Sequence, residues 1–218
     1  MKRRRMKADD LITRLANGPV ALSRRAASWR LELAVLVGVP LSLAILLAEY
    51  GLRRDLVHAM FWPMFWVKVL FPICIAAAGF VMAQRLARPG VEVRNAWMGA
   101  ALPVLVLRAM AALTWFDTPM AQRMPSLMGQ TWRTCTLRIG LLALPVLFTS
   151  LPALRGLAPT RPALAGAAAG VLAGGVGAAV YAMHCVELTA PFLAVWYVLG
   201  MVMPVIAGAA LGKFFLRW

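Results

Sequence analysis

The sequence is short of acidic side chains and of the residues and motifs on which most enzymes depend. Its 218 residues include 8 Asp and Glu, 2 His and 3 Cys, against 23 Lys and Arg. No glycine-rich dinucleotide motif, phosphate-binding loop or HExxH zinc motif occurs. The cysteines form no CxxC pair, which disfavours a membrane thiol oxidoreductase that passes electrons to a quinone. We therefore expect neither an enzyme nor a resident cofactor.

Apolar residues make up 62% of the chain, well above the share in soluble domains. A helix of about twenty apolar residues crosses the roughly 30 Å of hydrocarbon in a bilayer. Six such runs occur, at residues 31–50, 65–84, 97–116, 137–154, 163–183 and 192–212. The predicted fold is an all-α integral membrane protein with six transmembrane helices in residues 31–218, preceded by an extramembrane segment, residues 1–30.

The distribution of cations predicts the orientation, because Lys and Arg collect in cytoplasmic loops. Sixteen lie in residues 1–30, in the second and fourth loops and at the C-terminus, and four lie in the other loops. Both termini are therefore expected in the cytoplasm. The cationic N-terminal segment is too long for the charged start of a signal peptide, so we expect it to be retained. The net charge of +15 suits anionic lipid headgroups, and we expect lipids rather than nucleic acid as partners.

Two cysteines are predicted at one depth on the opposite, periplasmic face. A short loop joins the fourth and fifth spans, which should pack as an antiparallel hairpin. Cys135 precedes Arg155 by 20 residues and Cys185 follows Pro162 by 23, so helical rise places both about 30 to 35 Å from that loop. Disulfides persist in the periplasm, and one here requires Cα atoms within about 7 Å. Cys74, in the middle of the second span, is expected to be a small buried hydrophobe.

Both histidines fall on the same predicted face as these thiols. Thiolate and imidazole are ligands of zinc, cadmium and related soft ions. Cys135, Cys185, His184 and His58 are therefore candidate ligands for a transient heavy-metal ion. Unrelated cysteines packed in an apolar interior are the alternative interpretation.

Two features inside the spans concern packing and charge. Gly166, Gly170 and Gly174 repeat every four residues, which predicts a smooth stripe that allows close approach of a neighbouring helix. Arg108 falls within the third span, where a cation costs about 3 kcal/mol. It would serve a substrate or proton site in a small transporter or channel. Alternatively, it is a structural cation that faces the bundle and snorkels outward or pairs with Glu49, and we favour this second interpretation.

Three stretches of the sequence resemble one known family: "KADDLITRLA" near the N-terminus, "LRRDL" after the first span, and "HC" followed by "FLAVWYVLG". They resemble the NrsF family, the six-span anti-sigma factors of the bacterial inner membrane. The resemblance implies that a cytoplasmic N-terminal segment holds an extracytoplasmic-function sigma factor inactive. It also implies that two outward-facing cysteines, here Cys135 and Cys185, sense oxidative or heavy-metal stress and release the sigma factor. After the His-Cys pair the family pattern has a proline and further acidic residues, where this chain has "VELT".

The N-terminal segment contains a short helical pattern that suits a partner-binding role. Asp9 and Asp10 favour a helix start, and Leu11, Ile12 and Leu15 share one side. A helix of two turns is marginal alone in water. We therefore predict that it becomes ordered when its apolar side meets a partner. A surface helix on the membrane is the alternative.

Overall fold

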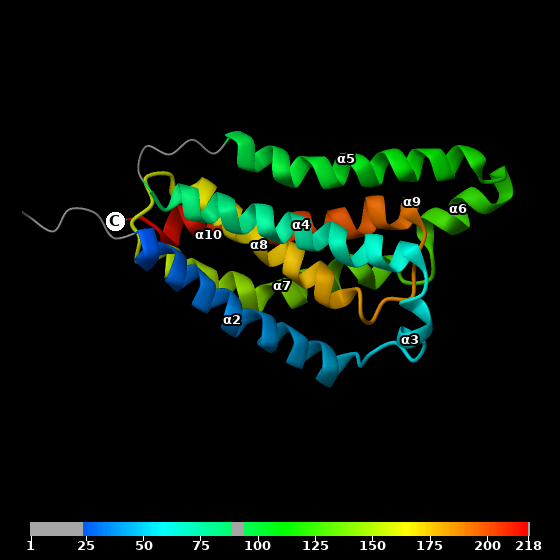
Figure 1. Ribbon diagram of the computed structural model, residues 1–218, viewed down its shortest axis with the longest axis horizontal. Helices are drawn as coiled ribbons and strands as arrows, with labels where there is room; N and C mark the ends of the chain where they lie inside the picture. Colours follow the sequence, from blue (N-terminus) through cyan, green and yellow to red (C-terminus); the bar gives the residue numbers. More distant parts are fainter. Residues whose placement is uncertain (1–23, 89–93, 218) are drawn as a thin grey trace, which may run out of the picture.

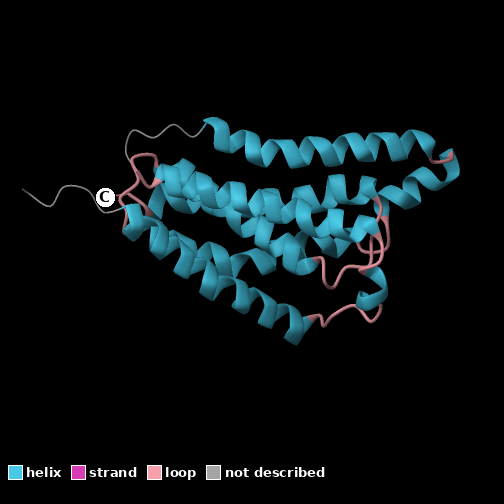
Figure 2. Cartoon of the chain, in the orientation of Figure 1, coloured by secondary structure: helices cyan, strands magenta, loops and turns pink. Residues whose placement is uncertain are grey.

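A computed structural model describes residues 24–88 and 94–217, and the regular structure in those residues is entirely helical (Figures 1 and 2). The predicted partner-binding residues Asp9, Asp10, Leu11, Ile12 and Leu15 lie outside the described residues. The helices are α2 (Arg24–Glu49), α3 (Leu56–Ala59), α4 (Pro63–Leu86), α5 (Arg94–Asp117), α6 (Met120–Met128), α7 (Trp132–Arg155), α8 (Pro162–Tyr181), α9 (Ala190–Phe192), η1 (Leu193–Tyr197) and α10 (Val198–Phe215).

Six helical segments are long and apolar enough to cross a membrane, as predicted. Four are the single helices α2, α4, α5 and α8. The other two are composite: α6 and α7 form the fourth, and α9, η1 and α10 form the sixth. Within the sixth span, η1 is one turn of π-helix, a rare widening of the helix that often occurs at functional sites.

Helix α8 is the centre of the bundle, and glycines bring three neighbours close to its backbone. A Cβ added at Gly170 would meet the backbone of α10 at Pro204 and Val205, and one at Gly175 would lie 2.5 Å from the Ala76 nitrogen of α4. One at Gly177 would lie 2.7 Å from the Ile139 carbonyl oxygen of α7. The predicted glycine stripe is confirmed, and its partner is α10. Small residues are what allow membrane helices to pack this closely.

The bundle has two distinct ends (Figure 1). Helix α2 begins, and α10 ends, at what we call the terminal end. The opposite end, which we call the cysteine end, carries α3, α6 and the loop between α8 and α9. Gly177 on α8 contacts Ile139 and Ala143 on α7, so these two helices form the predicted antiparallel hairpin.

The expectation that Cys74 is buried is wrong. The Cys74 side chain is exposed on α4, where it lines a groove between α4 and α5. Periodicity explains the difference, because α4 buries Phe71, Ile75 and Gly79 against the bundle and turns the face of Cys74 outward. Depth along the span did not determine which face the thiol occupies.

Arg108 faces the bundle, as the favoured interpretation has it, but the suggested pairing with Glu49 is wrong. Arg108 is exposed and reaches across the gap between α5 and α10 rather than pairing with Glu49. Glu49 ends α2, which lies on the opposite side of the bundle from α5 (Figure 1). Among the described residues, no carboxylate forms an ion pair with Arg108.

Candidate functional site: a buried thiol cluster at one end of the bundle

The site forms where α8 ends and the chain turns toward α9. Four consecutive backbone N–H groups, from Ala182 to Cys185, still bond to carbonyls in the last turn of α8. Beyond them the chain is irregular as far as Ala190. Cys185 is therefore fixed to the end of the central helix, and its side chain is 1% exposed.

Cys135 lies in the first turn of α7 and is 0% exposed. Its N–H donates to the Thr131 carbonyl over 2.9 Å, and the Thr131 hydroxyl lies 3.9 Å from the Cys185 sulfur. Residues four apart in a helical turn share one face, so Cys135 lies on the face that Thr131 directs toward Cys185. Both thiols are free and buried, and we call them and the side chains that surround them the thiol cluster.

Lys68 of α4 fixes the loop that carries Cys185. Its ammonium donates to the Cys185 carbonyl over 2.6 Å and to the Glu187 carbonyl over 2.7 Å. The side chain is 0% exposed, and the ammonium lies 5.4 Å from the centre of the Tyr197 ring. A buried cation is costly unless its donors are satisfied, and two carbonyls and an aromatic face meet that need. Lys68 therefore ties α4 to the loop and to η1.

Arg53 holds the same loop from the segment between α2 and α3. Its backbone N–H donates to the Met183 carbonyl over 3.1 Å, and its guanidinium donates to the Cys185 carbonyl over 3.3 Å. The guanidinium also donates to both carboxylate oxygens of Asp55, over 2.8 and 2.7 Å. This bidentate pairing lowers the pKa of Asp55 to about 2 and raises that of Arg53. Asp55 thus orients the guanidinium that contacts the loop.

The His184 ring uses both of its nitrogens in protein contacts. Its Nε2 lies 3.1 Å from Nη1 of Arg138, and its Nδ1 lies 3.0 Å from the Gly51 carbonyl. A guanidinium only donates, so Nε2 accepts and Nδ1–H donates to Gly51. Arg138 also stacks over Tyr50, 4.8 Å from the ring centre. Metal ligation by His184 would require one of these hydrogen bonds to break.

Glu187 connects the loop to the turn that precedes α7. Its carboxylate accepts a hydrogen bond of 2.6 Å from the Gln130 N–H. The turn at Gly129 has a positive φ of 54°, and an added Cβ there would lie 2.7 Å from the Glu187 carboxyl carbon. The backbone conformation therefore favours glycine, and a larger residue would also displace the Glu187 carboxylate.

A cavity of about 450 Å³ lies beside the loop that carries Cys185. Thr131, His184 and Cys185 line it, as does Arg53. Leu52, Arg54 and Val186 also line it and are exposed, so the cavity joins the surface to Cys185. A small molecule can therefore approach the loop that carries Cys185, although the side chain itself is buried.

Two tyrosines complete the cluster. Tyr181 and Tyr197 are each 0% exposed, their ring centres lie 5.9 Å apart, and both are electrostatic neighbours of the two thiols. Neither hydroxyl has a hydrogen-bond partner within the described part of the chain. The cluster therefore holds two buried hydroxyl groups without a hydrogen-bond partner in the described residues, beside two buried thiols.

The structure brings some of the predicted site residues together and separates others. Cys135 and Cys185 share the cluster, and His184 lies at its edge. His58 is exposed on α3. Across residues 24–88 and 94–217, no three Cys, His, Asp or Glu side chains form a group suited to a metal ion. The heavy-metal site thus stays a prediction, with the two thiols as its candidate ligands.

Sequence reasoning missed the residues that surround the thiols. Lys68 and Arg138 fall inside the predicted spans 65–84 and 137–154, where no sequence pattern assigns them a role, and Arg53 contributes only to the count of loop cations. The cost of a cation within a span was the available indication for the first two. Nothing in the sequence marks Tyr181, Tyr197 or Thr131, because their role depends on how α7, α8 and η1 meet.

Comparison with known proteins covers nearly the whole chain. The model of the family described as NrsF, negative regulator of sigma F, matches residues 15–218. A relative named probable anti-sigma-F factor NrsF, from Azospira oryzae, is 45% identical over 98% of this chain and 100% of the relative. The anti-sigma-F factor NrsF of Caulobacter vibrioides is 40% identical over the same shares. No solved structure matches the chain.

Proposed function

The chain belongs to the NrsF family of negative regulators of sigma F, and from this premise we propose that it is an anti-sigma factor of the bacterial inner membrane. In this role it holds a sigma factor of the extracytoplasmic-function class inactive at the membrane. The six apolar spans support the location. The full-length match to relatives named as anti-sigma factors supports the activity.

The partner binds at the terminal end, which faces the cytoplasm. Sixteen of the cations lie in segments assigned to that side, as expected for cytoplasmic loops. The N-terminal segment, residues 1–30, carries Asp9 and Asp10 and the apolar side formed by Leu11, Ile12 and Leu15. This segment makes the contact with the sigma factor, and anionic lipids contact its arginines.

The single observation that carries the sensing proposal is the pair of free, buried cysteines at the opposite end. Cys135 and Cys185 come from α7 and from the end of α8, and Thr131 lies between them. In the proposed reaction a peroxide-class oxidant takes two electrons and two protons from the two thiols, which form one disulfide, and the peroxide becomes water. A heavy-metal ion bound by both thiolates, with loss of two protons, would draw the same elements together.

Either event changes the position of the loop on the end of α8. Lys68 and Arg53 hold the Cys185 carbonyl in the reduced state, so a bond to Cys135 competes with these contacts. The release of the sigma factor requires two arrangements of the bundle that differ in affinity for it. Helix α8, in close contact with α4, α7 and α10, connects the two ends.

The experiment combines Cys135→Ser with Cys185→Ser and measures both a reporter of the sigma factor and its co-purification with the membrane protein. We expect the double variant to retain the sigma factor and to keep the reporter silent under peroxide or cadmium. Cys74→Ser, which changes an exposed thiol away from the cluster, is the matched control and should respond like the wild type. Normal induction in the double variant would overturn the sensor assignment.

Deletion of residues 8–17 tests the binding segment separately. We expect the deleted protein to insert into the membrane, to lose co-purification with sigma F of the same bacterium, and to leave the reporter always on. Retention of the sigma factor at the wild-type level would contradict this part of the proposal and leave the thiol test unaffected.

A further inference from the structure

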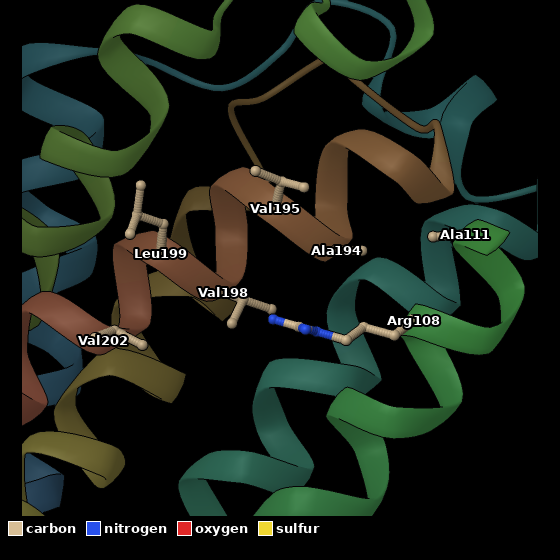
Figure 3. A pocket seen from close by; sticks show the side chains of 7 residues that line it. All are labelled: Arg108, Ala111, Ala194, Val195, Val198, Leu199 and Val202. Atoms are coloured by element: carbon tan, nitrogen blue, oxygen red, sulfur yellow. The ribbon is translucent and has the colours of Figure 1, made fainter. Parts of the chain in front are cut away.

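The cleft beside Arg108 lies outside the thiol cluster and carries a charge in an apolar setting. It is about 530 Å³ in volume and lies between α5 and the η1–α10 segment (Figure 3). Apart from Arg108, its lining is aliphatic, with Ala194 and Val195 from η1 and Val198 and Val202 from α10. The guanidinium extends from α5 across the cleft toward Val198.

The cleft opens on a surface that faces lipid in a six-span membrane protein. Val195, Leu199 and Val202 line it and are each at least 40% exposed on the outside of the bundle. Helix α5 is the least enclosed of the six spans, with 17% of its apolar window buried. A molecule in the bilayer can therefore enter from the side.

The guanidinium needs an anionic partner that the described chain does not supply. No carboxylate within residues 24–88 and 94–217 forms an ion pair with Arg108, and no hydrogen bond from it occurs there. An unpaired cation in hydrocarbon is costly. The occupant of the cleft should therefore combine one negative charge with an apolar body that fits valine and alanine walls.

We propose that this cleft binds the phosphate of an anionic phospholipid, with the first part of its acyl chains against η1 and α10. The planar guanidinium matches two phosphate oxygens at once. Val198 lies eight residues after Ala190, so helical rise places the guanidinium about 12 Å from the start of α9, in the third of the span nearest the cysteine end. A phospholipid of the leaflet at that end supplies the headgroup by moving slightly inward.

The experiment uses the full chain, purified in detergent, with phosphatidylglycerol and a diacylglycerol of the same acyl chains, which lacks the phosphate, added in equal amounts, and counts bound lipids by native mass spectrometry. We expect the wild type to retain about tenfold more phosphatidylglycerol than the other lipid, because one charge-assisted contact changes the affinity by about a factor of ten. Arg108→Gln should abolish the preference. Arg85→Gln removes the same charge from α4, away from the cleft, and should keep it.

Two further measurements distinguish a bound phospholipid from other occupants of the cleft. Val198→Phe fills the cleft without changing charge and should also lower retention of phosphatidylglycerol. Inorganic phosphate should not displace the lipid, and displacement would identify a site for free anions and overturn the proposal. Equal preference in the wild type and Arg108→Gln would overturn it as well, as would a dimer that Arg108→Gln abolishes, because the occupant would then be a second copy of the chain.

Discussion

At the scale of single residues, the thiol cluster depends on a lysine. Lys68, whose side chain is 0% exposed, makes two short hydrogen bonds to carbonyls of the Cys185 loop. Arg53 contacts one of the same carbonyls from another element. The loop that carries the thiol is thus held by two cations, while no carboxylate of the described chain pairs with Lys68. Removal of the ammonium would leave the partly buried Glu187 carbonyl without this hydrogen-bond donor.

We therefore predict that Lys68→Met loosens the loop. The substitution keeps an unbranched side chain of similar length and removes both hydrogen bonds, at a cost of about 1 to 3 kcal/mol for the Glu187 carbonyl, since Arg53 still donates to the Cys185 carbonyl. In a Cys74→Ser background, alkylation of Cys185 by N-ethylmaleimide, followed by mass spectrometry, should become at least about tenfold faster. Lys213→Met, on an exposed position of α10, is the control. An unchanged alkylation rate in Lys68→Met would show that Arg53 alone fixes the loop.

At the scale of elements, the central helix is distinguished by the small size of its side chains. Gly170 faces the backbone of α10, so a methyl group there would overlap Val205, whose Cα would lie 2.5 Å away. The α8 and α10 backbones would have to separate. Gly140 on α7 is the contrasting case, since the nearest atom to an added Cβ is the Met203 sulfur, 3.9 Å away.

We predict opposite outcomes for alanine at these two glycines. Gly170→Ala should lower the free energy of unfolding by about 1 to 3 kcal/mol through overpacking, and the unfolding midpoint by about 5 °C. Gly140→Ala should be neutral or slightly stabilising, because alanine favours helix and meets no obstacle. Thermal unfolding of the purified proteins in one detergent checks both. Equal midpoints for the two variants would mean that the seam between α8 and α10 relaxes without cost.

The elements were predictable where hydropathy alone decides them. The fifth predicted span, 163–183, differs from α8 (Pro162–Tyr181) by one or two residues at each end, and the glycine stripe was read correctly from its spacing. The short α3 and the π-turn at η1 were not predicted, because local chain geometry leaves little trace in composition. Cys74 was misplaced for a related reason: depth follows from sequence position, whereas the buried face depends on which helices become neighbours.

The site was predictable only in its sulfurs. Counting residues from the loop between α7 and α8 placed Cys135 and Cys185 at one depth, and the antiparallel hairpin makes that count valid. The contacts that hold them come from α4 and from the segment before α3, which are remote in sequence. Contacts of this kind form only when the six helices pack together, and no pattern in a single sequence identifies them.

At the scale of the whole molecule, the proposal requires the two ends of the bundle to face different compartments. We predict that single cysteines introduced at Ala121 on α6 and at Thr160 in the loop between α7 and α8, both exposed, will differ in labelling in a background in which Cys74, Cys135 and Cys185 are all replaced by Ser. A membrane-impermeant maleimide added to intact spheroplasts should label Ala121→Cys and spare Thr160→Cys. After lysis both should react. The reverse pattern would place the thiol cluster in the cytoplasm and exclude a periplasmic sensor.

The small side chains of α8 have a mechanical consequence. Where flexible side chains separate two helices, one helix can shift slightly without moving the other, because the side chains between them change rotamer. Along α8 few side-chain atoms separate the helices, because the backbone of α8 contacts neighbouring backbones at Gly170, Gly175 and Gly177. A displacement of the end of α8 at Cys185 therefore shifts the whole helix, and α4, α7 and α10 have to shift with it.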